Sequence, residues 1–122
     1  MKIGKSGEDY LEAILVLSQK NGSVRSVDVA NYMNFSKPSV SHAMKELRRK
    51  GYLEVAENGC LELTQEGQSL AERVYERHRF FVNQLLDAGV SQEVAERDAC
   101  EIEHIISEES FQKLKKNYEK SI

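Results

Sequence analysis

Three good metal ligands occupy consecutive turns of one predicted helix in the second half of the chain. Cys100, Glu103 and His104 stand at i, i+3 and i+4, and residues at these spacings are neighbours on a helix surface. A thiolate, a carboxylate and an imidazole that converge in this way can hold a divalent transition metal. How strongly such a cluster indicates a metal site depends on the elements that position it.

Two other segments carry side chains of the ligand type. Asp9 and Glu12 place two carboxylates at i and i+3 on one face of the first predicted helix, and His78 lies on a long predicted helix. The pair is equally well explained as acids near a helix N-terminus, and His78 taken alone is better explained as an ordinary polar histidine. Spacing does not show that the three segments meet in space.

The overall composition is that of a small protein without a disulfide framework. Its 122 residues suffice for one domain or two small ones that share a core. Cys60 and Cys100 are far apart and should be thiols in a reducing cytosol. No stretch approaches the roughly 18 apolar residues of a membrane span, and the polar start shows no signal pattern. We therefore expect a cytoplasmic protein without a membrane partner.

The net charge of −3 argues weakly against nucleic acid, but the charges are unevenly distributed. Basic residues gather between Lys37 and Lys50, whereas acids gather between Glu93 and Glu109. This asymmetry fits a DNA-reading part joined to a cation-binding part. Solvated helix faces are the simpler alternative, and charge alone does not overturn it.

The predicted order of elements in residues 1–70 is that of a winged helix-turn-helix DNA-binding domain. Ser6, Ser26 and Ser36 are candidate caps of three successive helices with apolar residues at helical spacing. Two short strands follow, over residues 52–55 and 61–63, and Asn58-Gly59 between them is a strong hairpin-turn signal.

Residues 71–122 are predicted to form a helical metal-binding and dimerisation domain, which makes the fold class mainly α. A long amphipathic helix restarts at Thr64, and Ser91 and Ser107 are candidate caps of two more helices. The domain has more large apolar side chains than one small unit needs, namely Phe80, Phe81, Leu85 and Leu86. A two-fold homodimer would bury them and match a palindromic operator.

The helix over residues 37–49 is predicted to enter the major groove of double-stranded DNA. Hydroxyls contact base edges or phosphates, lysines and arginines mostly phosphates, and the hairpin tip can follow the adjacent groove. His42 is ambiguous, and Cys60 is best explained as a small half-buried hydrophobe. Winged helices also serve as protein-interaction modules, but the basic helix favours DNA. The candidate DNA-binding residues are Lys37, Pro38, Ser39, Ser41, His42, Lys45, Arg48, Arg49 and Asn58.

Several motifs together resemble the DtxR/MntR family of bacterial metal-dependent repressors over nearly the whole chain. They lie at residues 8–14, 37–41, 50–53, 63–67, 77–79, 98–100 and 102–107. The resemblance implies a metal-loaded dimeric repressor of metal-uptake genes, similar to the short members without an SH3-like domain. It also implies that the metal ligands are Asp9, Glu12, His78, Cys100, Glu103 and His104.

The resemblance is a hybrid of two metal types. Manganese-type members usually carry a carboxylate at the position of Cys100, whereas iron-type members usually carry Met at the position of Glu12 and Glu at that of Val82. Carboxylates favour Mn²⁺ and a thiolate favours Fe²⁺, Co²⁺ or Zn²⁺. We expect Mn²⁺ or Fe²⁺ as the cellular metal, with Zn²⁺ or Co²⁺ able to bind in vitro, and one or two ions per chain.

Two other functions compete with the metal-dependent repressor. A winged-helix regulator that responds to a small molecule, with a merely structural metal cluster, would bind DNA regardless of chelator. A small metalloenzyme would use Glu12 or Glu101 as a base beside a metal-bound water. The chain shows no Gly-rich phosphate loop and no nucleophile elbow, so we expect neither an enzyme nor a small organic substrate.

Overall fold

The structure is a computed structural model that describes residues 3–120. The chain divides into two compact units, Met1–Arg73 and Val74–Ile122, and helix α4 (Gln65–Asp87) contributes to both. The boundary placed at residue 70 from the sequence lies within the same helix. Each unit is described by itself below.

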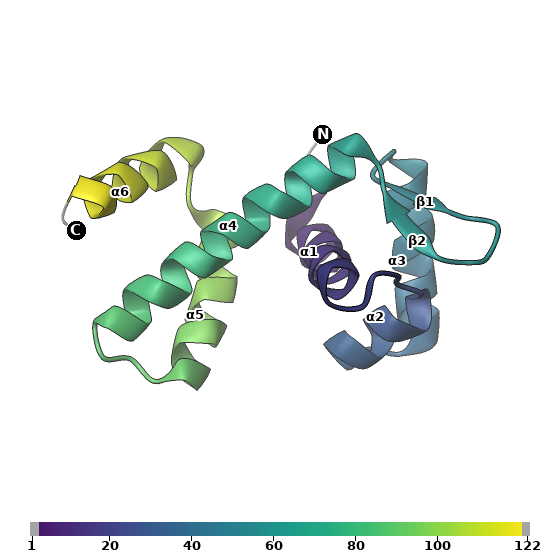
Figure 1. Cartoon of the computed structure of the whole chain (residues 1–122), viewed down its shortest axis with the longest axis horizontal. Helices are drawn as coiled ribbons and strands as arrows, with labels where there is room; N and C mark the ends of the chain where they lie inside the picture. The colour runs from purple at the N-terminus through teal and green to yellow at the C-terminus, as the bar shows by residue number, and fades with distance from the viewer. Residues whose placement is uncertain (1–2, 121–122) are drawn as a thin grey trace. The chain divides into compact units, whose positions relative to one another are not determined.

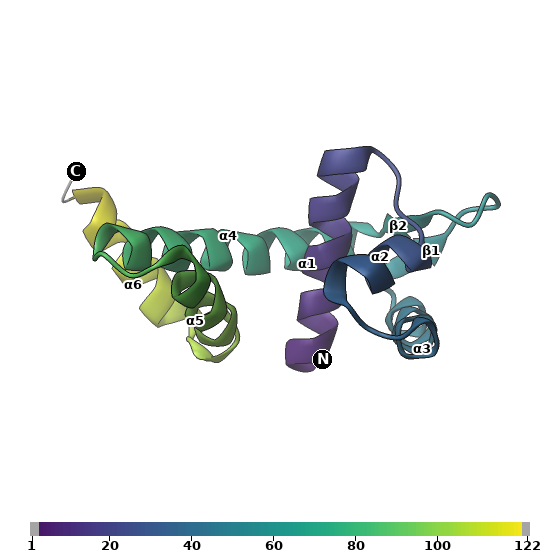
Figure 2. The same cartoon turned by 90° about the horizontal axis from the view of Figure 1, so that it is seen from below.

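The first unit is a winged helix-turn-helix, as the sequence predicts. Its elements are α1 (Gly4–Asn21), α2 (Ser26–Met33), α3 (Lys37–Arg49), β1 (Leu53–Val55) and β2 (Leu61–Leu63), followed by the start of α4 (Figure 1). The two strands pair antiparallel, with Leu53 opposite Leu63 and Val55 opposite Leu61. Figure 2 shows α3 end-on beside α2, with the hairpin extending from the same unit. The predominantly helical fold is thus confirmed.

Apolar side chains at helical spacing form the core of this unit. The most deeply buried of them come from α1, α2, α3 and β1, and they are Leu11, Ile14, Val29, Val40 and Leu53. The α3 stripe leaves the opposite face of that helix to polar and basic residues. Packing of the apolar stripe therefore fixes which side of α3 is presented to a ligand.

Three of the predicted helix caps are present. Ser36 Oγ accepts from the Ser39 backbone N–H at 3.3 Å and so caps α3. Ser91 does the same at the start of α5 (Gln92–Ile105), and Ser107 accepts from the Ser110 N–H at 3.1 Å at the start of α6 (Glu108–Lys120).

The other two predicted caps were wrong, Ser6 by three residues and Ser26 by one. Helix α1 begins at Gly4, so Ser6 lies inside its first turn, and the Ile3 side chain folds over Gly7, where a Cβ would come within 2.9 Å of it. Ser26 is the first residue of α2 rather than its cap. The capping position is Arg25, one residue earlier. The Asp28 carboxylate accepts a hydrogen bond from the Arg25 backbone N–H at 2.9 Å.

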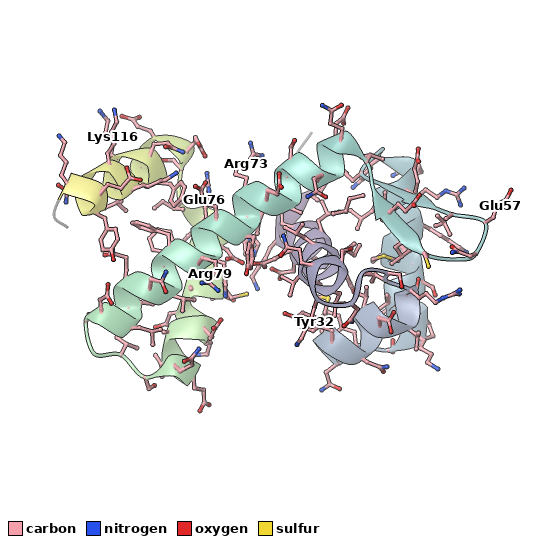
Figure 3. All side chains as sticks on the ribbon, viewed as in Figure 1. Tyr32, Glu57, Arg73, Glu76, Arg79 and Lys116 are labelled. Atoms are coloured by element: carbon pink, nitrogen blue, oxygen red, sulfur yellow. The ribbon has the colours of Figure 1, made fainter. Side chains whose placement is uncertain are left out.

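The hairpin turn is built by side-chain and backbone hydrogen bonds at its tip. Asn58 Oδ1 accepts from the Cys60 N–H at 3.1 Å, and Gly59 has a φ of 87°, a conformation that favours glycine. Glu57 lies at the exposed tip (Figure 3). The turn is therefore specified locally by Asn-Gly, as the sequence predicts.

A tight junction joins the hairpin to α4. Thr64 Oγ1 donates to the Gly51 carbonyl at 2.7 Å and accepts from the Gly67 N–H at 3.1 Å, which caps α4. A Cβ on Gly67 would lie 2.0 Å from the Tyr52 carbonyl oxygen. Glycine is required at residue 67 because no larger residue leaves room for that backbone.

The second unit consists of the rest of α4 with α5 and α6. Its buried core is Phe81, Val82, Ala95, Ala99 and Phe111, and Phe80 packs against it with edge-on ring contacts. This core holds the α4 and α5 faces together and so positions the polar side chains at its margin. Among residues 3–120, no helix is both long and apolar enough to cross a membrane.

Candidate metal centre

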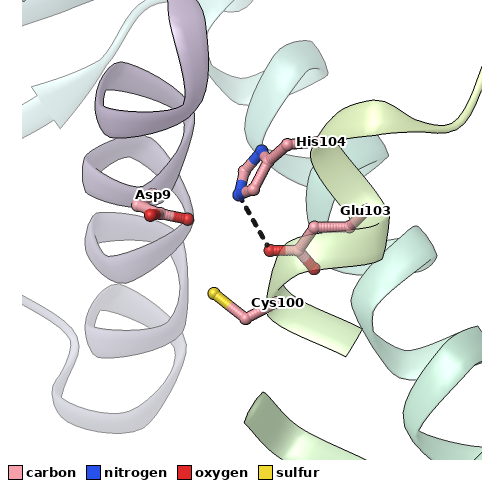
Figure 4. Close-up of side chains that lie close together, drawn as sticks. All are labelled: Asp9, Cys100, Glu103 and His104. Atoms are coloured by element: carbon pink, nitrogen blue, oxygen red, sulfur yellow. Dashed lines mark ion pairs between the residues drawn. The ribbon is translucent and has the colours of Figure 1, made fainter. Parts of the chain in front are cut away.

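Helix α5 presents the three ligand-type side chains that the sequence singles out. Cys100, Glu103 and His104 project from neighbouring turns of the same helix (Figure 4). Each offers one ligand atom, and these atoms lie within 4.8 Å of one another. A single ion can contact all three after small side-chain adjustments, since metal–ligand distances of about 2.0–2.3 Å place two ligands about 3–4 Å apart.

His78 joins this group from α4. Its Nδ1 lies 3.0 Å from Glu103 Oε2, while His104 Nε2 lies 3.3 Å from Glu103 Oε1. Each of the two carboxylate oxygens of Glu103 thus faces an imidazole. The structure therefore brings four predicted ligands together within one unit.

Burial makes this cluster unusual. Glu103 is 1% exposed and is the only charged residue among the buried residues of the described part of the chain. Removing a carboxylate from water is costly unless a cation or strong hydrogen bonds compensate. A buried carboxylate, two imidazoles and a thiol form a donor set suited to a divalent transition metal, so the residues present fit such an ion.

Arg77 holds in place the end of α5 that carries the candidate ligands. Its guanidinium donates to the carbonyls of Ile106 at 2.8 Å and Glu103 at 3.4 Å, and to the Glu108 carboxylate at 2.6 Å. It also lies over the Phe111 ring, 5.3 Å from the centroid. The planar guanidinium of Arg77 thus links α4, the end of α5 and the start of α6.

Asp9 and Glu12 belong to the first unit. Both are half-buried on α1, three residues apart and hence on one face of the helix; Figure 4 draws Asp9 on that helix. Their role as ligands stays a prediction. Val82, where iron-type members carry a ligand, is 6% exposed and packs in the apolar core of the second unit.

Sequence reasoning missed one carboxylate that contacts the cluster. Glu96 Oε2 lies 2.8 Å from His78 Nε2, on the opposite side of the ring from Glu103. Glu96, Cys100 and Glu103 stand at i, i+4 and i+7 on α5, which places them on one face. That spacing was a signal available in the sequence, but it does not reveal that His78 lies against the same face.

The candidate DNA-binding residues are all exposed. Eight lie on α3, from Lys37 to Arg49, and Asn58 lies in the hairpin turn. Arg49 donates through Nε to Glu46 at 3.0 Å, and this hydrogen bond together with the Arg49 charge lowers the pKa of the Glu46 carboxyl. Arg49 is therefore paired with an acid on its own helix, although its side chain, like that of Lys45, is exposed to solvent.

Two family profiles match nearly the whole chain. The N-terminal DNA-binding domain of the iron-dependent repressors matches residues 2–61, and the metal-binding and dimerisation domain of the same repressors matches residues 64–120. The chain belongs to the DtxR/MntR family of metal-dependent transcriptional repressors. Both halves deduced from the sequence are thus assigned to the same family.

Individual members of the family are similar to this chain over most of its length. The transcriptional regulator MntR of Escherichia coli O6:H1 is 40% identical over 104 residues, which cover 85% of this chain and 67% of that protein. The iron-dependent repressor IdeR of Mycobacterium bovis is 34% identical over 110 residues, covering 89% and 48%. The structure of the manganese regulator SloR superposes with a TM-score of 0.81 at 28% identity, covering 98% of this chain and 55% of that one.

These relatives are transcriptional regulators rather than enzymes, as the sequence predicts. The chain spans about half the length of the IdeR and SloR chains that it matches. Manganese and iron regulators both occur among the matches. The comparisons therefore do not decide between the two metal types that the ligand set combines.

Proposed function

We propose that this protein is a metal-dependent repressor that binds a palindromic operator as a homodimer when it is loaded with Mn²⁺ or Fe²⁺. The observation that carries the proposal is the buried Glu103 carboxylate with His78 and His104 on its two oxygens, beside Cys100. A cluster that served only to pack the two helices would not need a buried charged group at this position, whereas a metal site does. Family membership supplies the DNA-binding half of the function.

The proposed metal ligands are the four residues of the second unit together with Asp9 and Glu12 of α1. A bound divalent cation supplies the positive charge that offsets several converging acidic groups. Without that charge, these acids repel one another when they approach. Asp9 and Glu12 are rigidly placed, because the helix that carries them packs its apolar stripe in the core of the DNA-binding unit. As ligands they tie that unit to the helical unit.

This coupling explains how metal controls DNA binding. The two reading helices of a dimer must meet half-sites on matching faces of the duplex, so only one spacing of the heads binds well. Ligands contributed by both units favour that spacing over looser arrangements, which is a population shift toward the DNA-binding state. In each head, α3 enters the major groove and its lysines and arginines contact phosphates.

The homodimer is proposed on the helical unit. Leu86 and Leu114 are exposed there at 36% and 45%, and Phe80 is only partly buried. These side chains gain burial in a two-fold interface, where the same patch meets itself. Ferrous or manganous ion is proposed as the cellular signal, and Zn²⁺ or Co²⁺ as ions that bind in vitro, with one or two ions per chain. The proposed targets are genes for metal uptake.

The test is DNA binding to the protein's own upstream region under anaerobic conditions. Mn²⁺, Fe²⁺ and Zn²⁺ are titrated separately, and each titration is reversed with a chelator. Metal-dependent binding supports the repressor, and the ion that works at the lowest free concentration plausible in a cell identifies the signal. Equal binding with and without metal would leave a DNA-binding protein without a metal switch.

A further inference from the structure

Each of the two ring nitrogens of His78 faces a carboxylate of α5. Glu103 Oε2 lies 3.0 Å from Nδ1, and Glu96 Oε2 lies 2.8 Å from Nε2. Glu103 is buried within the candidate ligand cluster, whereas Glu96 is exposed and lies outside the groups of side chains whose ligand atoms converge. The two carboxylates therefore have different surroundings: Glu103 is placed to be a metal ligand, and Glu96 is not.

Glu96 is itself oriented by its own helix. Gln92, one turn earlier on α5, donates through Nε2 to Glu96 Oε1 at 3.4 Å. The other oxygen, Oε2, faces the histidine. Glu96 thus has one oxygen engaged within α5 and one directed at the ring on α4. Such an arrangement suits an acceptor that holds a ring in place.

A histidine that ligates a metal through one nitrogen almost always donates its other N–H to a carboxylate, a carbonyl or water. That hydrogen bond fixes the tautomer and the orientation of the ring and raises the basicity of the ligating nitrogen. In His78 the nitrogen on the ligand side is Nδ1, because it faces Glu103, and the nitrogen facing away is Nε2.

We propose that Glu96 is a positioning residue: its carboxylate accepts the Nε2–H of His78 and thereby presents Nδ1 as the metal ligand. This inference rests on the proposed metal site and adds to it a residue that no ligand assignment includes. Glu96 contacts the histidine and not the ion. Its removal therefore weakens metal binding without removing a ligand.

Four variants of the whole chain test this role. Glu96→Ala removes the acceptor, and Glu96→Gln retains a carbonyl that can still accept from Nε2–H but lacks the charge. Glu93→Ala is the matched control, because Glu93 is another exposed acid on α5. His78→Gln identifies the His78 signals in the spectra.

The first measurement is long-range proton–nitrogen correlation spectroscopy of the histidine-labelled, Zn²⁺-loaded protein. We expect His78 to show a metal-shifted Nδ1 and a protonated, slowly exchanging Nε2–H, and we expect that proton to exchange faster in Glu96→Ala. Ligation through Nε2 overturns the positioning role. The absence of a metal shift on either His78 nitrogen overturns the proposed ligand set instead, so the two failures are distinguishable.

The second measurement is Mn²⁺ affinity and stoichiometry by chelator competition. Loss of such an orienting partner typically costs about 10- to 100-fold in metal affinity, so we expect a loss of that size in Glu96→Ala, a smaller loss in Glu96→Gln and none in Glu93→Ala. Stoichiometry stays unchanged in every variant. A Glu96→Ala protein with unchanged affinity, or with one ion fewer per chain, overturns the proposal.

Discussion

Arg77 donates from Nη1 to the backbone carbonyl of Ile106 at 2.8 Å, at the end of the helix that carries Glu103 and His104. Helix ends leave carbonyls without partners inside the helix, and here a side chain from another helix supplies one. The Arg77 side chain is 12% exposed, so water replaces it poorly. The end of α5 that carries the candidate ligands thus depends on a residue that is not itself a candidate ligand.

Arg77→Lys should therefore destabilise the second unit even though the charge is kept. A lysine cannot reproduce the planar fork that reaches Ile106 and Glu108 together, and leaving a buried acceptor unsatisfied costs about 1–3 kcal/mol. We expect a loss of about 2 kcal/mol in urea unfolding of the metal-free protein. Hydrogen exchange should rise at the end of α5 and the start of α6.

The matched control is Arg73→Lys, an exposed position on α4 (Figure 3). It should leave the unfolding midpoint unchanged. If Arg77→Lys is as stable as this control, the hydrogen bonds to the end of α5 do not stabilise the unit.

Glu12→Gln and His104→Ala test the ligand set from the two units separately. Each should abolish metal-dependent operator binding, because each removes a donor from one side of the proposed coupling. The far-ultraviolet circular dichroism and the dimer mass should stay unchanged, since neither residue belongs to the apolar core. A variant that still responds normally to metal would show that its residue is not a ligand.

Much of the fold follows from signals that act within a few residues. Ser36, Ser91 and Ser107 cap their helices, and Asn58-Gly59 forms the turn, because these residues bond to backbone groups close by. The prediction that Ser6 caps the first helix was wrong because it also relied on a local signal alone. Serine is a good capping residue, but packing of Ile3 on Gly7 lets the helix begin earlier.

The candidate site was less accessible to sequence reasoning. The cluster on α5 is local, so its i, i+3 and i+4 spacing was visible. The contacts of His78 with Glu103 and Glu96 join residues 25 and 18 positions apart, and only packing of α4 on α5 creates them. Arg77 appeared in the sequence only as part of the motif at residues 77–79 and received no role, because two of its partners are backbone carbonyls, which leave no mark in the sequence.

Lys45→Ala should weaken operator binding through the loss of a phosphate contact. An exposed lysine on α3 contributes through counterion release, so the slope of log affinity against log salt should fall by about one. The effect should be similar for specific and non-specific DNA. Lys113→Ala on α6 is the control, and equal slopes in both variants would remove Lys45 from the interface.

Glu46→Gln should have the opposite effect. The Glu46 carboxylate binds the guanidinium of Arg49 and adds negative charge to α3, the helix proposed to contact DNA. Its loss frees Arg49 for a phosphate and lowers the repulsion of the duplex. We expect tighter, more salt-dependent binding in filter or fluorescence assays, and no gain in the double variant Glu46→Gln, Arg49→Ala relative to wild type.

Tyr118 provides a pH-dependent contact between α6 and α4. Its hydroxyl donates to Asp87 Oδ2 at 3.1 Å, and this hydrogen bond, with the Asp87 charge and some burial, raises the pKa of the phenol. The contact is present below the ordinary tyrosine pKa of about 10 and is lost as pH rises through the raised value. In a spectrophotometric titration, Asp87→Asn should make one tyrosine ionise earlier, and Tyr118→Phe should remove that late component. An unchanged titration in Asp87→Asn would contradict the contact.

Cys100→Glu tests whether the thiol sets the metal preference. A thiolate favours softer ions such as Zn²⁺ and Co²⁺, whereas a carboxylate suits Mn²⁺. We therefore expect Zn²⁺ and Co²⁺ affinity to fall by more than Mn²⁺ affinity, and the thiolate-to-metal charge-transfer band of the Co²⁺ protein to disappear. Cys60→Ser is the control, because that cysteine lies beside the hairpin turn in the first unit and outside the cluster. If both variants keep the wild-type order of affinities and the band, Cys100 is not a ligand, and the carboxylates and histidines alone determine which ion the protein senses.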